Sequence, residues 1–85
     1  MKTAFVTGGS RGIGSAIALA LGKTFHVVVG FANSEDKAND VVKEIIAAGG
    51  SASTVQIDIS DAESVDSAFT TIEKEYNSVD VLINN

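Results

Sequence analysis

A glycine-rich loop, Thr7-Gly8-Gly9-Ser10-Arg11-Gly12-Ile13-Gly14, contains the residues of this sequence best suited to chemistry. It follows a short apolar run and leads into a segment rich in alanine and leucine, which predicts a turn from strand to helix. Glycines at positions 8, 12 and 14 permit positive φ and close approach of a ligand to the backbone. The free N–H groups and positive dipole end of the following helix attract phosphate. The loop therefore predicts a dinucleotide site.

The glycine spacing separates this loop from two common phosphate-binding motifs. Counting from Gly12, the fingerprint G-x-G-x-x-G fails because Ile17 stands where the third glycine is required. The triphosphate loop fails because Gly14 is followed by Ser15-Ala16 rather than by lysine and a hydroxyl residue. The remaining pattern, T-G-x-x-x-G-x-G, resembles that of the short-chain dehydrogenase/reductase family. The string TGGSRGIG is most similar to the 3-oxoacyl-[acyl-carrier-protein] reductases within it.

The order of apolar and helical patterns predicts the fold. Apolar runs indicate strands and helical spacing indicates helices, in alternation: strands over 2–7, 26–31, 53–58 and 79–84, and helices over about 12–21, 34–48 and 60–77. Alternation requires right-handed parallel crossovers, with an expected strand order of 3-2-1-4. We therefore predict an α/β fold, a Rossmann-type three-layer sandwich. Residues 1–85 would form the N-terminal part of a single dinucleotide-binding domain, with its crevice between the first and fourth strands.

Spacing within each predicted helix indicates which residues face the sheet. The expected buried residues are Ile13, Ile17, Ala20 and Leu21 of the first helix, Ala38, Val41, Val42, Ile45 and Ile46 of the second, and Val65, Ala68, Phe69, Ile72 and Tyr76 of the third. Ser34 and Ser60 are expected to cap the second and third helices at their N-termini, and Asn77 to end the third in a left-handed conformation.

Composition excludes several classes of function. The net charge of −5 argues against nucleic acid and anionic membrane as partners. Absence of cysteine excludes disulfides and thiolate metal sites and fits a cytoplasmic protein. No apolar run approaches the ~20 residues needed to span a bilayer. We predict no metal site.

The choice of cofactor follows from the end of the second strand. NAD sites place an acidic residue there, about 20 residues beyond the glycine loop, to bind the ribose 2′-hydroxyl. Residues 30–34 contain none. Arg11, Asn33 and Ser34 could instead supply a cation and hydrogen-bond donors to a 2′-phosphate, so we predict NADP(H); the alternative for Arg11 is a solvated loop arginine. The resemblance also implies NADP(H), since arginine before the second glycine is usual there, although many of the reductases have arginine where this chain has Asn33.

The resemblance implies further cofactor contacts. The loop residues Gly8, Ser10, Gly12, Ile13 and Gly14 would hold the cofactor. An aspartate in the position of Asp58 receives the adenine amino group in the family, and the backbone of Ile59 would touch the ring. The alternative for Asp58 is a carboxylate that interacts with the dipole of the third helix. Asn84, in the pair Asn84-Asn85, would hold the sheet and line the crevice, whereas Asp80 is expected to be a structural hydrogen-bonding residue.

No catalytic residue is predicted in this sequence. The family uses a tyrosine and a lysine four positions later, but the single tyrosine, Tyr76, is followed at that spacing by Asp80. His26 is interpreted as a residue at the start of a strand and not as a base.

The resemblance implies an NADPH-dependent oxidoreductase that reduces a carbonyl, most closely 3-oxoacyl-[acyl-carrier-protein] in fatty-acid biosynthesis. Such a protein would be a cytoplasmic homotetramer. The alternatives are a non-catalytic NADP(H)-binding fragment and another carbonyl or sugar reductase of the family.

Overall fold

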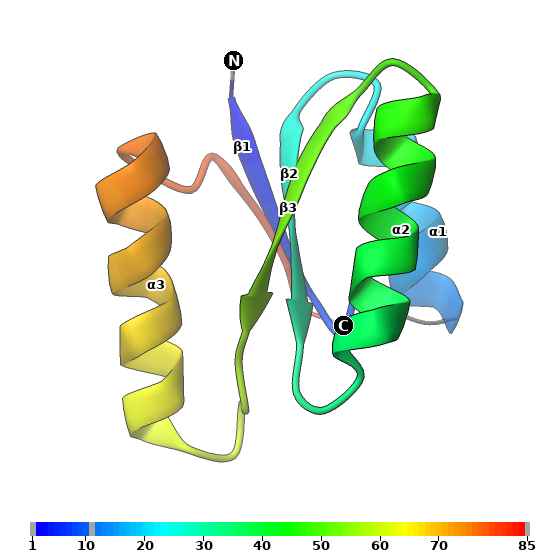
Figure 1. Ribbon diagram of the computed structural model, residues 1–85. Coiled ribbons are helices and arrows are strands. Elements are labelled where there is room, and N and C mark those ends of the chain that lie inside the picture. Colours follow the sequence, from blue (N-terminus) through cyan, green and yellow to red (C-terminus); the bar gives the residue numbers. More distant parts are fainter. Residues whose placement is uncertain (1, 11, 85) are drawn as a thin grey trace.

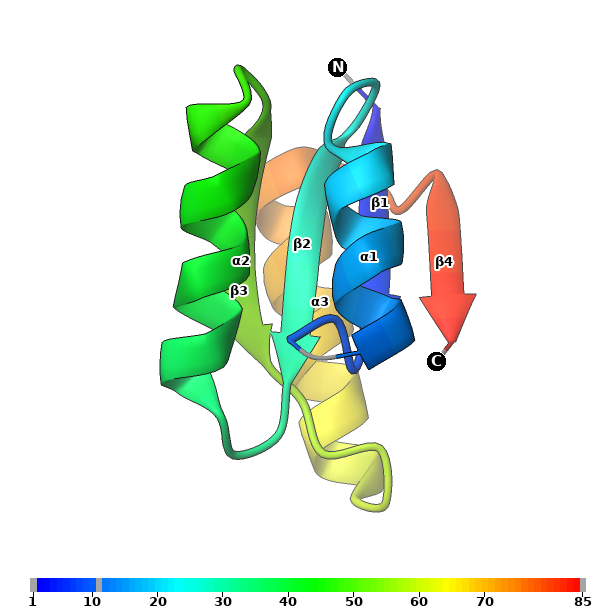
Figure 2. The same ribbon diagram turned by 90° about the vertical axis from the view of Figure 1, so that its right-hand side faces the viewer.

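A parallel sheet lies between two layers of helices in the computed structural model, which describes residues 2–10 and 12–84 (Figures 1 and 2). The elements are β1 (Thr3–Thr7), α1 (Gly12–Leu21), β2 (His26–Phe31), α2 (Glu35–Ala47), β3 (Ser51–Gln56), α3 (Ala62–Tyr76) and β4 (Val81–Asn84). All neighbouring strands are parallel, in the order β3-β2-β1-β4, which confirms the predicted topology. Helices α1 and α2 cover one face and α3 covers the other (Figure 1).

The central strand β1 is buried along its whole length. It pairs with β2 on one side and β4 on the other, so that Ala4 lies opposite both Val27 and Val81. Both faces of β1 and β2 are covered, which explains why their sequences are continuous rather than alternating apolar runs.

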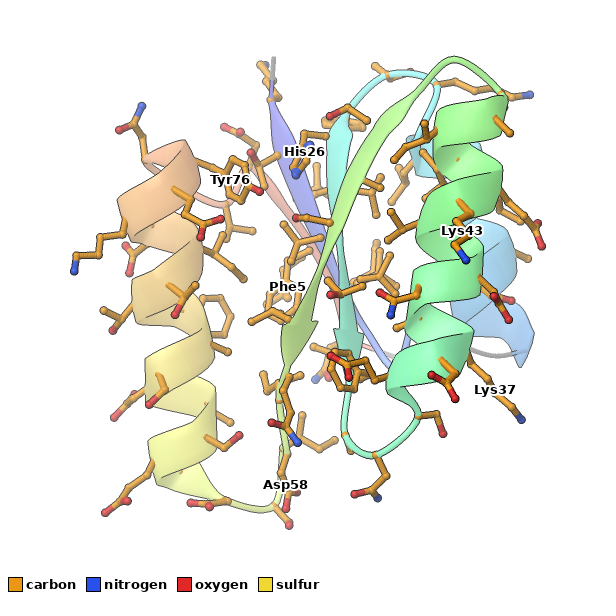
Figure 3. The ribbon with its side chains drawn as sticks, viewed as in Figure 1. Phe5, His26, Lys37, Lys43, Asp58 and Tyr76 are labelled. Carbon is orange, nitrogen blue, oxygen red and sulfur yellow. The ribbon has the colours of Figure 1, made fainter. Side chains whose placement is uncertain are left out.

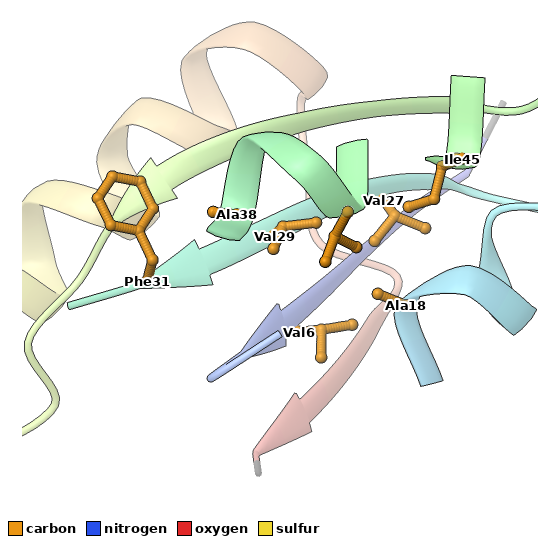
Figure 4. Packing of buried hydrophobic residues seen from close by; sticks show 8 residues of the cluster. Val6, Ala18, Val27, Val29, Phe31, Ala38 and Ile45 are labelled. Carbon is orange, nitrogen blue, oxygen red and sulfur yellow. The ribbon is translucent and has the colours of Figure 1, made fainter. Parts of the chain in front are cut away.

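Side chains of the sheet alternate between two hydrophobic cores. The core beneath α1 and α2 contains Val6, Ala18, Val27, Val29, Phe31, Ala38, Val41 and Ile45 (Figure 4). The core beneath α3 contains Phe5, Val28, Ile57, Ala68 and Ile72. The rings of Phe5 and Phe69 meet edge to face with centroids 5.3 Å apart. The five residues expected on the buried stripe of α3 all belong to this second core or pack against it, so that prediction is confirmed.

The contact face predicted for helix α1 is only partly right. Ile17 and Leu21 pack against the core as expected, but Ile13 is 75% exposed and Ala20 is also exposed. The buried residues of the helix are Gly14 and Ala18, whose small side chains let it lie close to the strands. Ile46 of α2, expected to be buried, is 55% exposed.

Several predicted boundaries and caps are wrong by one or two residues. Strand β3 begins at Ser51 rather than 53, and β4 at Val81 rather than 79. Asp61, not Ser60, is the N-cap of α3, and its carboxylate accepts a hydrogen bond from the N–H of Glu63 at 3.0 Å. Ser34 occupies the N-cap position of α2 without a side-chain capping bond. Asn77 ends α3 with the expected positive φ, 74°, but its ψ of −55° lies outside the left-handed helical region.

Asp80 joins the beginnings of β4 and β1. The N–H of Thr3 donates to Oδ2 of Asp80 at 2.8 Å, and the N–H of Asp80 donates to the carbonyl of Thr3 at 2.9 Å. The predicted structural role of Asp80 is thus confirmed. This reciprocal pair fixes the register of β4 and provides a partner for a backbone donor at the start of β1.

A polar cluster lies at the amino ends of β2 and β3 (Figure 3). Nδ1 of His26 is 2.6 Å from Oγ of Ser51, and Nε2 is 3.1 Å from Oγ of Ser53. The hydroxyl of Tyr76 lies 3.0 Å from the same Ser53 oxygen, and its ring lies against His26 with centroids 4.4 Å apart. The cluster therefore ties the end of α3 to the sheet, on the edge opposite the glycine loop.

We expect Asp80→Ala to lower the free energy of unfolding by about 1 kcal/mol, because it removes a charged acceptor from a partly buried N–H group. Asp80→Asn keeps an acceptor oxygen and should lose less. Urea unfolding measures both changes. An alanine variant with the wild-type midpoint would show that the bond between Thr3 and Asp80 does not stabilise the fold.

Stability should fall as pH is lowered from 7.5 to 5.5 because of His26. Burial lowers the pKa of His26 below its ordinary 6.5, and the charge of Glu75 partly offsets this effect. The unfolded chain therefore binds the proton first, so the contribution is complete above about pH 6.5 and declines below it until the folded-state pKa is passed. Urea unfolding across this window should show a smaller slope for His26→Gln than for wild type; equal slopes would contradict the assignment.

Candidate functional site

The glycine loop lies at the carboxyl end of β1, and the loops after β2 and β3 meet it at the same edge of the sheet (Figures 1 and 2). Ligands of open parallel sheets bind at this edge, where the strand order reverses. A hollow of about 450 Å³, here called the loop hollow, is lined by Gly8, Ser10, Gly12, Phe31, Ala32, Asn33 and Ser34.

Backbone conformation in the loop fits a bound phosphate. Gly8 and Gly12 have φ of 64° and 56°, which side-chain-bearing residues rarely adopt. A Cβ at Gly12 would meet no described atom within 4 Å, so its backbone faces open space that a ligand could enter. As at any helix N-terminus, the first N–H groups of α1 have no partner within the helix and suit an anion. The loop therefore fits a pyrophosphate group.

Gly14 and Gly9 differ from the sequence interpretation. Gly14 was expected to share the positive φ, but it is buried in α1 without it, and its small size allows the helix to lie close to the sheet. Gly9 was not singled out, yet its N–H donates to the carbonyl of Gly30 at 3.1 Å. A Cβ on Gly9 would lie 3.1 Å from the carbonyl oxygen of Val6. The second glycine of the string T-G-G was the sequence feature that could have indicated this close backbone contact.

Among the described residues that line the loop hollow there is no carboxylate. Asn33 and Ser34 line it, as expected, while Glu35 and Asp36 lie in the first turn of α2. Arg11, the predicted cation, lies outside the described residues, as does Asn85. Sequence reasoning did not single out Lys37 (Figure 3). It borders a groove that is also lined by Asn33, Ser34, Glu35 and Asp36. Lys37 lies within a predicted helix, and nothing in the sequence around it indicates that it borders this groove.

Asp58 is exposed and is held on one side by Ser60. Its Oδ1 accepts hydrogen bonds from the hydroxyl of Ser60 at 2.6 Å and from the N–H of Ser60 at 3.0 Å. The N–H of Asp58 donates to Oγ of Ser64 at 2.8 Å. The Ser60 hydroxyl, and secondly its N–H, hold the pKa of Asp58 below the ordinary value, so this carboxyl is ionised at neutral pH.

A second hollow of about 330 Å³ lies beside β4. This β4 hollow is lined by Thr7, Ile57, Ile59, Val65, Phe69, Leu82 and Asn84. The hydroxyl of Thr7 lies within donating distance of the carbonyl of Ile83, at 3.3 Å, and of Oδ1 of Asn84, at 3.2 Å. Asn84 is thus bonded across the sheet, as expected. Thr7, the first residue of the glycine motif, was not predicted to take this role.

The structure thus divides the predicted site residues between two neighbouring hollows. Gly8, Ser10, Gly12, Asn33 and Ser34 line the first, and Ile59 and Asn84 line the second. Asp58 precedes Ile59 in the chain, whereas Ile13 and Gly14 belong to the first turn of α1 and line neither hollow.

The described residues contain no group of three or more histidine, cysteine, aspartate or glutamate side chains placed to hold a metal ion. None of the helices in this part of the chain has the length and apolar character to cross a membrane.

Comparison with known proteins gives consistent matches over the whole chain. The family model for short chain dehydrogenase matches residues 2–85. A 3-oxoacyl-[acyl-carrier-protein] reductase of Synechocystis sp. is 48% identical over 99% of this chain and 34% of its own length. The chain therefore spans about a third of that relative.

Solved structures agree with the sequence matches. A dehydrogenase/reductase of Sinorhizobium meliloti is 42% identical with a TM-score of 0.93, covering 99% of this chain and 34% of that one. A metagenomic short-chain oxidoreductase, solved in complex with NADP, is 38% identical with a TM-score of 0.90, covering 95% of this chain and 37% of that one. The glycine loop, the strand order and these matches agree, and the chain belongs to the short-chain dehydrogenase/reductase family.

Proposed function

We propose that the protein carrying this chain is an NADPH-dependent oxidoreductase that reduces a carbonyl group. Residues 1–85 would be the N-terminal part of its dinucleotide-binding domain. The observation that carries the proposal is the loop hollow, where glycines of positive φ and the start of α1 meet a lining whose described residues include no carboxylate. The relative solved with NADP supports the same cofactor.

In this proposal, different residues at the carboxyl edge of the sheet bind different parts of the cofactor. The loop would hold the pyrophosphate through Gly8, Ser10, Gly12 and the backbone of Ile13, with Gly14 packing behind it. The ribose 2′-phosphate would then be bound by Arg11, Asn33 and Ser34.

The adenine would lie at the end of β3. Asp58 would accept a hydrogen bond from its amino group, and the backbone of Ile59 would contact its ring. Asn84 would line the crevice while it remains bonded to Thr7.

Bound NADPH supplies the hydride for such a reduction, and the residues of this chain bind and orient it. Tyr76 is not proposed as the proton donor, because its hydroxyl is bonded to Ser53 at the opposite edge of the sheet. We therefore assign no catalytic residue within residues 1–85.

The proposed substrate is a 3-oxoacyl thioester on acyl carrier protein, in fatty-acid biosynthesis. It rests on the reductase of Synechocystis sp. and on the string TGGSRGIG. By the same resemblance we propose a homotetramer in the cytoplasm. A non-catalytic NADP(H)-binding fragment is the second candidate, because residues 1–85 have no tyrosine–lysine pair at the required spacing.

We expect NADPH to bind more tightly than NADH, and Arg11→Ala to weaken NADPH binding roughly 10–100-fold, because a hydrogen bond to a charged group contributes about 1.5–3 kcal/mol. NADH lacks the 2′-phosphate and should lose little affinity. Fluorescence titration or calorimetry with both cofactors measures the difference. Equal affinity of the wild-type protein for the two would overturn the choice of NADPH.

Two further variants control this experiment. Lys23→Ala removes an exposed positive charge just after α1, at the end of the helix away from the loop, and should leave both affinities unchanged. Gly12→Ala should instead weaken NADPH and NADH alike, because it strains the backbone that serves the shared pyrophosphate.

The substrate is tested by following the consumption of NADPH by the protein at its natural length. We expect a higher kcat/KM with a 3-oxoacyl thioester than with a simple ketone or a sugar, because the similar reductase of Synechocystis sp. is named for that substrate. Turnover of only the sugar or ketone would favour another reductase of the family. Tight NADPH binding with no turnover of any carbonyl would favour the non-catalytic reading.

A further inference from the structure

We propose that Ser60 is a positioning residue that orients the carboxylate of Asp58 toward the adenine amino group. The inference rests on the proposed function. It concerns the exposed side chain of Asp58, which has several rotamers, and how one of them is fixed before a ligand binds. Ser60 itself would not touch the cofactor.

The hydrogen bonds around Asp58 are asymmetric. Both the hydroxyl and the N–H of Ser60 donate to the same oxygen, Oδ1, at 2.6 and 3.0 Å. No described residue donates to Oδ2. One oxygen is therefore occupied within the protein, and the other keeps its capacity to accept a hydrogen bond from a ligand.

Ser60 is available for this task because it does not cap α3. Asp61 accepts the N–H of Glu63 instead, which leaves the Ser60 hydroxyl directed to Asp58. On the other side, Ser64 of α3 accepts the N–H of Asp58 at 2.8 Å. The backbone and the carboxylate of Asp58 are thus held by two different serines.

The surroundings of Asp58 suit a flat ring with an amino substituent. Ile59, the next residue, is 64% exposed and lines the β4 hollow together with Ile57. An apolar surface beside a fixed acceptor favours a ligand that offers both a ring face and an N–H donor, as adenine does. Holding the carboxylate in one rotamer before binding reduces the entropy that binding must remove.

The test compares NADPH with reduced nicotinamide hypoxanthine dinucleotide phosphate, which carries a carbonyl oxygen in place of the adenine amino group. In the protein at its natural length, wild type should bind NADPH about tenfold more tightly than the analogue. Ser60→Ala should reduce this ratio several-fold, mainly by weakening NADPH. Ser60→Thr keeps the hydroxyl and should restore most of it.

Ser67→Ala is the matched control, since Ser67 is an exposed serine of α3 whose side chain makes no bond to Asp58. A carboxyl carbon NMR titration without ligand provides an independent reading, because loss of the Ser60 hydroxyl should raise the pKa of Asp58 toward 3.8. Ser67→Ala should change neither the pKa nor the binding ratio.

The outcomes separate the inference from the function beneath it. A Ser60→Ala variant with a raised Asp58 pKa and the wild-type binding ratio would overturn the positioning role and leave the cofactor proposal standing. Equal wild-type affinity for the two dinucleotides would overturn both the role of Ser60 and the adenine contact of Asp58. Failure of wild type to bind NADPH at all would overturn the proposed function itself.

Discussion

The burial of β1 on both faces and both edges is the constraint on which the rest of the structure depends. No residue of this strand is exposed, so its direction and register are fixed by β2, β4 and the two cores. Because all the strands are parallel, their carboxyl ends lie at one edge of the sheet. The glycine loop after β1 is therefore held at the same edge as the ends of β2, β3 and β4. The position of the candidate site is therefore a consequence of the sheet.

The binding of an anion by a chain of net charge −5 depends on local geometry. Charges separated by more than ~8 Å are largely screened at physiological ionic strength, so the total charge has little influence at one edge of the sheet. The described residues that line the loop hollow include no carboxylate, and its donors are backbone N–H groups and the uncharged side chains of Ser10, Asn33 and Ser34. The acidic residues Glu35 and Asp36, in the first turn of α2, line a separate groove.

Periodicity predicted the features that depend on large apolar side chains. It failed where small residues determine how closely two elements pack, or where a hydrogen bond joins residues far apart in the sequence. The strand order and the buried stripe of α3 followed from apolar patterns. The contact face of α1 followed only in part: Ile17 and Leu21 pack against the core, but Gly14 and Ala18 approach the sheet because they are small. Gly22 shows the same effect at the end of that helix, since a Cβ there would lie 2.7 Å from Ile45. The partners of His26 are 25 and 27 residues away, and no local pattern indicates them.

The two edges of the sheet differ in how far their polar groups are satisfied. At the amino edge, both nitrogens of His26 and the hydroxyl of Tyr76 bond to serines of β3, so this cluster keeps little capacity for a ligand. At the carboxyl edge, Asp58 uses one oxygen for Ser60 and offers the other to solvent, beside an exposed Ile59. No buried side-chain nitrogen or oxygen of the described residues lacks a partner, so the unused capacity lies at the surface. The polar groups of the amino edge therefore stabilise the fold, whereas those of the carboxyl edge remain available to bind a ligand.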